Sequence, residues 1–278
     1  MTLTDFQFVA NLIRDRSGLV LSEEKAYLLE SRLMPLTRKA GMKSLDELVA
    51  VVRAKRDDGI VKDIVEAMTT NESLFFRDTK PFQQLRDIVF PKLTKSRASS
   101  RKIRIWCAAC SSGQEPYSIA MTIKEAGALY SGWNFEIVAT DLSTVMLDKA
   151  KSGMFSQFEV QRGLPITLLV KYFNQDGDKW KISSELISMV RFSPFNLLSN
   201  PAALGEFDIV FCRNVLIYFD RDTKARVLDG IGSIMPDDGV LYLGGAETVL
   251  GLTEIFRPVS DQRGMYQLTR GAGMRMSA

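Results

Sequence analysis

The segment Ile103-Arg-Ile-Trp-Cys-Ala-Ala-Cys-Ser-Ser-Gly-Gln-Glu-Pro-Tyr-Ser118 passes from an apolar run into a loop of small residues. The run at 103–108 predicts a strand, and the stretch 117–130 predicts a helix. In doubly wound α/β folds, ligands bind where such a strand passes into its helix, at the carboxyl end of the sheet. The small residues at 111–113 let the backbone approach a ligand, but the G-x-G-x-x-G pattern of dinucleotide binding is absent.

Strand and helix patterns alternate after this segment. Further strands are predicted at 135–140, 207–211, 240–243 and 265–268, and further helices at 145–150 and 223–234. The alternation indicates an α/β protein with a parallel, doubly wound sheet. Residues 153–192 interrupt it with turn residues and short β-prone runs, which predicts an inserted small antiparallel β-subdomain.

The first part of the chain has helical patterns only. Capping-box patterns at Thr4-x-x-Gln7 and Ser44-x-x-Glu47 precede apolar stripes with helical spacing. Basic residues interleaved with serines predict a solvated linker that contains Lys92, Lys95, Arg97, Arg101, Lys102 and Arg104. The sequence therefore predicts a helical domain over 1–78, a helix and basic linker over 79–102, a sheet domain over 103–270 and a tail over 271–278.

The composition excludes several kinds of chemistry. The chain has no histidine, which excludes Ser-His and Cys-His nucleophilic catalysis and His-ligated metal sites. Its cysteines, Cys107, Cys110 and Cys212, are too few for a disulfide framework and are interpreted as small buried thiols. The net charge of +3 is too small to indicate nucleic-acid binding. Because no membrane-length apolar run and no signal-peptide pattern occur, a cytoplasmic protein is expected.

Two acidic residues stand at the expected ligand-binding edge. Glu115 lies beside the loop, where a carboxylate disfavours phosphate but suits a sulfonium or an amino group; a favourable acid at a helix N-terminus is the alternative. Asp141 ends a strand pattern, where an acid is the usual partner of ribose hydroxyls. Capping of the next helix is the alternative for Asp141, although Ser143 can fill that role.

Polar residues near other strand ends complete the candidate site. The Asn196 amide can read an adenine edge, and Asn214 and Tyr218 are expected inside the cleft; ordinary turn asparagines are the alternative. In the segment Thr69-Thr-Asn-Glu-Ser-Leu-Phe-Phe-Arg77, the arginine can hold a carboxylate in two-point geometry. The alternative for this segment is a strand that packs between domains.

In this order, the blocks resemble the CheR family of chemotaxis receptor methyltransferases. The matching strings are Thr-Thr-Asn-x-x-x-Phe-Phe-Arg at 69–77, Ser-x-Gly-x-Glu-Pro-Tyr-Ser at 111–118, Thr-Asp at 140–141, Asn-Leu-Leu at 196–198 and Cys-Arg-Asn-Val-Leu-Ile-Tyr-Phe at 212–219. The resemblance implies an all-α N-terminal domain and a Rossmann-like S-adenosylmethionine methyltransferase domain that carries the β-subdomain. It also implies a protein-glutamate O-methyltransferase that esterifies chemoreceptor glutamates for chemotactic adaptation, yields S-adenosylhomocysteine and uses no metal.

The resemblance further implies roles for individual residues. Arg77 and Tyr218 would be the catalytic residues, closest to the methyl group and the incoming glutamate. A third helix with Arg53, Lys55 and Arg56 would face the cytoplasmic helical domain of the receptor. The contacts to S-adenosylmethionine would come from Asn71, Ser73, Arg77, Glu115, Asp141, Asn196, Leu197, Asn214 and Val215. A monomer is expected, without nucleic acid as a partner and without direct membrane insertion.

Some positions depart from the family pattern. Ser73 replaces threonine and keeps the hydroxyl, and Gly244-Gly-Ala-Glu247 replaces Gly-His-Ser-Glu, which suggests that this histidine is dispensable. The loop at 174–178 looks shorter than in members that dock a receptor C-terminal pentapeptide, so methylation independent of the pentapeptide is expected. Two other classes stay open, a nucleic-acid methyltransferase, favoured by the basic linker, and a non-catalytic S-adenosylmethionine-sensing signalling module.

Overall fold

The computed structural model describes residues 2–54 and 58–269. The chain forms two compact units. The first runs to Thr70 and includes Tyr218–Thr223, and the second comprises Asn71–Ile217 and the chain from Lys224 onward. Among the described residues, no helix is long and apolar enough to cross a membrane.

The first unit is helical, as predicted. Its helices are α1 (Leu3–Ser17), α2 (Ala26–Lys39), α3 (Leu45–Arg53) and α4 (Asp58–Met68), with a short 3₁₀ turn η1 (Glu23–Lys25) before α2. Their apolar stripes meet in one core, where Ile13 and Leu29 are fully buried. The helical spacing of the apolar residues therefore gives each helix one apolar face, and burial of these faces holds the four helices together.

The helix caps differ in part from the prediction. The capping box of α1 is formed by Thr2 and Asp5, so the prediction at Thr4 and Gln7 is wrong. Thr2 lies just before the helix, and its hydroxyl accepts a hydrogen bond from the Asp5 N–H at 3.2 Å. The capping box predicted at Ser44 and Glu47 is confirmed in its first half, because the Ser44 hydroxyl accepts from the Glu47 N–H at 3.2 Å. The second half differs, because the Glu47 carboxylate accepts from the Lys43 N–H at 2.8 Å and not from the Ser44 N–H.

The second unit contains the predicted mainly parallel sheet, in the order β6-β2-β1-β7-β8-β10-β9. Its strands are β1 (Lys102–Ala108), β2 (Asn134–Asp141), β6 (Val190–Pro194), β7 (Ile209–Cys212), β8 (Val240–Leu243), β9 (Phe256–Pro258) and β10 (Met265–Leu268). β6, β2, β1, β7 and β8 run parallel, whereas β10 pairs antiparallel with both β8 and β9. The register aligns Ala108 with Thr140 and Cys212, so the carboxyl ends form one edge.

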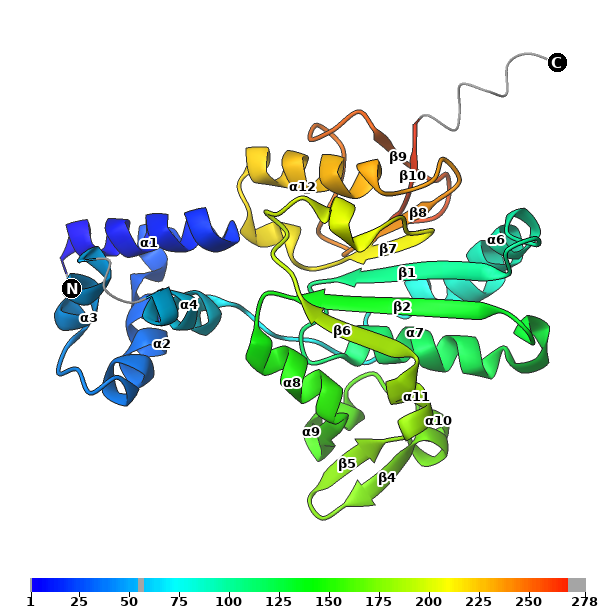
Figure 1. Cartoon of the computed structure of the whole chain (residues 1–278), viewed down its shortest axis with the longest axis horizontal. Helices are drawn as coiled ribbons and strands as arrows, with labels where there is room; N and C mark the ends of the chain where they lie inside the picture. Colours follow the sequence, from blue (N-terminus) through cyan, green and yellow to red (C-terminus); the bar gives the residue numbers. More distant parts are fainter. Residues whose placement is uncertain (1, 55–57, 270–278) are drawn as a thin grey trace. The chain divides into compact units, whose positions relative to one another are not determined.

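Burial explains the apolar strand sequences. Every residue of β7 and β8 is buried, which is typical of parallel strands covered on both faces. Besides the helices of the small sheet described below, this unit contains α5 (Lys80–Gln84), α6 (Phe90–Ser96), α7 (Gln114–Glu125), α8 (Thr144–Ser152) and most of α12 (Arg221–Ser233), whose residues up to Thr223 belong to the first unit. α7 and α8 pack against β2 and β6 (Figure 1). α7 begins at Gln114, before the predicted residue 117, and a 3₁₀ turn at Gly127–Tyr130 follows it.

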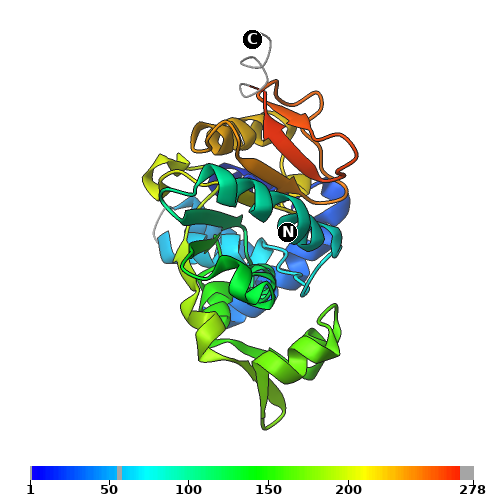
Figure 2. The same cartoon turned by 90° about the vertical axis from the view of Figure 1, so that its right-hand side faces the viewer.

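A small antiparallel sheet interrupts the main sheet in sequence, as predicted. Its order is β3-β5-β4, and it lies beyond β6 and α8, apart from the main sheet (Figures 1 and 2). Its elements are β3 (Met154–Ser156), α9 (Gln157–Gln161), α10 (Ile166–Tyr172), β4 (Phe173–Asp176), β5 (Lys179–Ile182) and α11 (Ser184–Ser188). We call residues 154–188 the β-subdomain.

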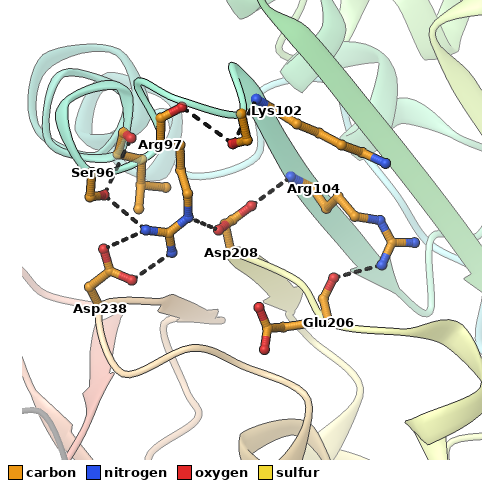
Figure 3. Close-up of polar contacts among 9 residues, drawn as sticks. Ser96, Arg97, Lys102, Arg104, Glu206, Asp208 and Asp238 are labelled. Carbon is orange, nitrogen blue, oxygen red and sulfur yellow. Dashed lines mark hydrogen bonds and ion pairs between the residues drawn. The ribbon is translucent and has the colours of Figure 1, made fainter.

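Ion pairs tie the chain before β1 to the amino edge of the sheet (Figure 3). Arg97 makes hydrogen bonds with Asp208 at 2.8 Å and with Asp238 at 2.6 and 3.0 Å. Asp208 also accepts a bond from the Arg104 backbone N–H at 2.8 Å. Hydrogen bonds from Arg104 and Lys102 hold the pKa of Glu136 down to about 2.

The prediction of a solvated basic linker is therefore wrong for Arg97 and Arg104. Their side chains are only 21% and 19% exposed, because they pair with acids from distant parts of the sequence. A run of basic residues cannot reveal such partners. Two of the basic residues that favoured a nucleic-acid methyltransferase are therefore paired with acids of the protein itself.

Candidate functional site

The candidate site lies along the carboxyl edge of the main sheet. Loops that follow β1, β2, β6 and β7 start there because the register brings these strand ends level. Asp141 ends β2, and its carbonyl accepts a hydrogen bond from the Phe195 N–H at 3.0 Å, which places residues 196–197 beside it. The structure thus brings several predicted residues to one edge: Glu115, Asp141, Asn196, Leu197, Asn214 and Val215.

The loop after β1 is held in an unusual backbone conformation. Ala109, Ser111 and Gly113 all have positive φ, at 62°, 49° and 94°. At Gly113 a side chain would strain the backbone and its Cβ would lie 2.9 Å from the Cβ of Ala150. The glycine therefore lets α7 start close against α8.

Asp141 fixes this loop. Its carboxylate accepts hydrogen bonds from the Ser111 N–H at 2.7 Å and from the Ser143 N–H at 2.9 Å. The cap of α8 is Ser143, whose hydroxyl accepts from the Met146 N–H at 3.3 Å. Ser143 is thus the N-cap of α8, and the Asp141 carboxylate stands between the loops after β1 and β2.

Arg213, directly after β7, is the central cation of the site. Its side chain is only 2% exposed and donates to Glu115 at 3.0 Å, to Asp78 at 2.5 Å and to the Arg77 carbonyl at 3.0 Å. Its buried Nε has no hydrogen-bond partner among the described residues. A buried unpaired donor costs free energy.

Ionisation of Glu115 costs desolvation free energy. Burial raises the pKa of Glu115 above its usual range, and the Arg213 guanidinium opposes this rise. Repulsion from Glu247 also raises the pKa, and Arg77 lowers it. The carboxylate therefore lies in a desolvated position where an added cation would be strongly favoured.

Glu247 organises the turn after β7. Its carboxylate accepts from the N–H groups of Asn214 at 2.7 Å, Val215 at 2.9 Å, Leu216 at 2.8 Å and Gly244 at 2.7 Å. Asn214 has a positive φ of 59°, and this cradle of bonds holds it in that conformation. The last residue of the Gly244-Gly-Ala-Glu247 string thus has a structural role.

The segment before α5 is attached to the same edge. The Asn71 carbonyl accepts from the Ser111 hydroxyl at 2.8 Å, and the Phe76 N–H donates to the Ser118 hydroxyl at 2.9 Å. These bonds bring Asn71, Ser73 and Arg77, which the sequence also predicted, to the start of α7. The Arg77 guanidinium donates to the Glu72 carbonyl at 3.4 Å.

The β-subdomain holds this segment from its other side. Phe75 is fully buried and meets the rings of Phe155 and Phe173 edge to face, with centroids 5.0 and 5.6 Å apart. A Cβ on Gly163, whose φ is +86°, would lie 2.1 Å from the Phe75 carbonyl oxygen. Arg162 pairs with Glu72 at 2.7 Å. The segment therefore packs inside the second unit, and Phe75 anchors it.

The asparagine alternatives are partly resolved. The Asn196 side-chain oxygen accepts from the Leu198 N–H at 3.0 Å, which is the geometry of an Asx turn. Asn196 thus has the turn role, which leaves its predicted adenine contact untested.

Two other predicted residues belong to the first unit. Tyr218 belongs to the first unit, where its carbonyl accepts from the Val20 N–H at 2.9 Å. Arg53 ends α3 and pairs with Asp5 at 2.9 Å, with its side chain 42% exposed. Lys55, Arg56 and the tail 271–278 lie outside the described residues.

Sequence reasoning did not assign roles to Arg213 and Glu247. Both residues lie within the longer strings at 212–219 and 244–247 that carry the family resemblance or depart from it. Their signal is position, because each follows a buried strand on the ligand-binding edge, where an ionisable residue is rarely accidental.

The chemistry of the site favours binding over nucleophilic catalysis. Cys107, Cys110 and Cys212 are buried free thiols, as predicted, and burial raises their pKa well above the usual value. They are therefore unreactive. Buried carboxylates at Glu115 and Asp141, with small residues between them, suit a ligand that carries hydroxyls and positive charge.

Comparison with known proteins gives a consistent result. The description "CheR methyltransferase, all-alpha domain" matches residues 4–69, and "CheR methyltransferase, SAM binding domain" matches residues 71–265. Chemotaxis protein methyltransferase Cher2 of Pseudomonas putida is 43% identical over 270 residues, which cover 95% of this chain and 97% of the relative. Chemotaxis protein methyltransferase 1 of Pseudomonas aeruginosa is 42% identical over 267 residues, covering 94% and 96%. The Vibrio parahaemolyticus chemotaxis protein methyltransferase is 40% identical over 274 residues, covering 96% and 98%.

Proposed function

Because the chain belongs to the CheR methyltransferase family, we propose that it methylates glutamate side chains of chemoreceptors with S-adenosylmethionine. The products are glutamyl methyl esters and S-adenosylhomocysteine. The observation that carries the proposal is the match of both family domains in order, over residues 4–69 and 71–265, joined to an acid-lined edge in the second.

In this proposal the acids at the edge bind different parts of the cofactor. Asp141 accepts hydrogen bonds from the ribose hydroxyls, because it ends β2 at the position where an acid binds ribose in related folds. Glu115 balances the positive charge of the methionine end, which relieves the desolvation of its carboxylate. Further contacts come from Asn71, Ser73, Arg77, Asn196, Leu197, Asn214 and Val215.

Arg77 and Tyr218 act on the acceptor glutamate in this proposal. A glutamate is already ionised at neutral pH, so no general base is required, in agreement with a chain without histidine. A carboxylate oxygen would attack the methyl carbon in line with its bond to sulfur, and that bond would break so that the sulfur leaves as the neutral thioether of S-adenosylhomocysteine. Orientation then supplies most of the acceleration, for which ~7–11 kcal/mol is available in principle.

We also propose that methylation does not need a tethering pentapeptide. β4 and β5 pair up to Asp176 and Lys179, so only Gly177 and Asp178 connect them. So short a connection supports the proposal, because it offers little surface for a docked receptor tail. Equal methylation of a receptor with and without its C-terminal residues is expected.

The proposed function is tested by transfer of a radiolabelled methyl group to purified receptor cytoplasmic domains. We expect label on glutamate that mild base releases as methanol, since carboxyl esters are base-labile. Base-stable label would refute the proposal, because it indicates methylation of nitrogen. Retention of activity after nuclease treatment of the reaction separates a protein acceptor from a nucleic-acid acceptor.

A further inference from the structure

A cavity of about 580 Å³ lies between the β-subdomain and the loops of the candidate site. Its walls come from α8, β3, α9 and β5, and from residues 71–73 and 112–114. Cavities of this size are typical of ligand sites. Asn71 and Ser73, two of the residues proposed to contact the cofactor, line this cavity.

Charged side chains line the cavity, and most of them are paired. Lys149 forms an ion pair with Glu159, and Arg162 pairs with Glu72 at 2.7 Å. Burial raises the pKa of Glu159, but hydrogen bonds from Lys149 and Ser156 outweigh it, so the pKa falls below its usual value. These pairs contribute no net charge to the cavity.

Lys179 is the remaining cation of the wall. It is exposed at the start of β5, and no ion pair or hydrogen bond to its side chain occurs among the described residues. Its position is fixed by the backbone, because Lys179 pairs with Ser156 on one side and with Asp176 on the other. The cavity wall therefore carries one positive charge that has no ion-pair partner among the described residues.

An apolar side chain accompanies this charge. Phe158 on α9 is 65% exposed and also lines the cavity, and the Arg162 guanidinium lies 5.0 Å from the centroid of its ring. A cavity whose wall carries both a cation and an exposed ring suits a polypeptide with acidic and apolar side chains better than a small anion, which would contact only the cation.

We propose that this cavity binds an acidic side chain of the substrate protein, next to the glutamate that receives the methyl group. The inference rests on the proposed function, since it assigns a second subsite to the same acceptor. Lys179 pairs with the second carboxylate, and Phe158 packs against an apolar neighbour. The subsite thus selects glutamates that stand in acidic surroundings.

The test compares charge variants of the full-length enzyme. Lys179→Glu and Lys179→Gln are measured with a receptor cytoplasmic domain, beside Lys95→Glu and Lys95→Gln as matched controls. Lys95 is an exposed lysine in the last turn of α6, away from the cavity. We expect Lys179→Glu to raise the KM for the receptor by about tenfold, Lys179→Gln by less, and neither control to change it by more than about twofold.

The other kinetic constants distinguish the explanations. We expect kcat and the KM for S-adenosylmethionine to stay within about twofold in the Lys179 variants. A raised KM for S-adenosylmethionine would overturn the inference, because it would assign the cavity to the cofactor. An unchanged KM for the receptor, with wild-type methylation intact, would overturn the subsite and leave the proposed function standing.

A substituted receptor completes the cycle. When acidic residues flanking the methylated glutamate are changed to their amides, the wild-type enzyme should lose the advantage that it holds over Lys179→Gln. Additive effects of the two changes would contradict direct pairing. If the wild-type enzyme methylates no receptor domain, the proposed function itself fails, which is a different result.

Discussion

The Nη1 atom of Arg213 lies 3.0 Å from Oε2 of Glu115, and the arginine side chain is almost completely buried. The same guanidinium donates to the Asp78 carboxylate and to the Arg77 carbonyl. Arg213 thus joins the strand end of β7 to the start of α7 and to the segment before α5. The stability and the ionisation of the candidate site both depend on this contact.

Arg213→Met should leave the Glu115 carboxylate buried without its cation. We expect the free energy of unfolding to fall by about 3–5 kcal/mol, as for other broken buried pairs. The double variant Arg213→Met, Glu115→Gln should recover part of the loss, because it removes both charges. Urea denaturation measures each value, and Arg86→Met, at the exposed pair with Asp87, is the control with a loss below about 1 kcal/mol. A double variant less stable than Arg213→Met alone would contradict the pairing.

When the pH is lowered, the affinity for S-adenosylmethionine should begin to fall at a higher pH than it would with a glutamate of ordinary pKa at position 115. Burial raises the pKa of Glu115, so the folded protein takes up a proton there above the usual range, and the neutral acid no longer balances a cation. Titration calorimetry from about pH 5 to about pH 8 follows the loss. In Glu115→Gln the affinity should be low at every pH, and it should fall less when the pH is lowered. An equally large loss of affinity at low pH in the variant and in the wild type would assign the titration to another group.

Glu247→Gln should destabilise the turn after β7. The amide keeps one oxygen but turns an NH₂ group toward backbone N–H groups that now donate to a carboxylate. We expect a loss of about 2–4 kcal/mol in the free energy of unfolding, together with weaker cofactor binding. Glu254→Gln, at an exposed position, should stay within about 0.5 kcal/mol. Wild-type stability of Glu247→Gln would show that the cradle contributes little.

Gly163→Ala and Gly177→Ala form a matched pair. Both glycines have positive φ, at +86° and +61°, but an added Cβ meets the Phe75 carbonyl oxygen only at Gly163. We expect a loss of about 1 kcal/mol at Gly177 from backbone strain. At Gly163 we expect a loss of about 3 kcal/mol or more and reduced affinity for S-adenosylmethionine, because residues 71–77 must shift. Equal effects in thermal unfolding and in binding would show that the contact is easily relieved.

Arg77→Ala should separate catalysis from folding. The side chain is partly exposed, and its described hydrogen bond to the Glu72 carbonyl is long, so its removal should cost less than about 1 kcal/mol of stability. The methylation rate should fall by about 10²–10³-fold, since a positioned charge at the reacting groups is lost. Arg86→Ala provides an exposed arginine control. Near-normal turnover of Arg77→Ala would remove Arg77 from the mechanism.

Much of the fold follows from local pattern. The α/β class, the helical first unit and the antiparallel insertion were predictable because apolar periodicity and turn residues act over short distances. The position of Asp141 and Glu115 at the carboxyl edge was predictable because the ends of parallel strands share one edge. The capping alternative at Asp141 needed the structure, since Ser143 was an equally good cap in the sequence.

Contacts between distant residues were beyond the sequence patterns. The partners of Arg97 are Asp208 and Asp238, which lie more than a hundred residues away, so its segment looked solvated. The role of Arg213 depends on Glu115 and Asp78 in the same way. Burial of a charge is decided by these partners, and no single segment contains the information.

The anchoring of Phe75 between Phe155 and Phe173 limits how this protein can be recombined. Residues 154–188 look like a cassette that relatives could exchange to acquire new receptors. A chimera that takes only this cassette from a relative inherits one half of an aromatic cluster and one half of the Arg162–Glu72 pair. Exchange that keeps this packing therefore requires two crossover regions, one at residues 72–75 and one around the cassette, so the cassette is inherited together with the segment that precedes α5.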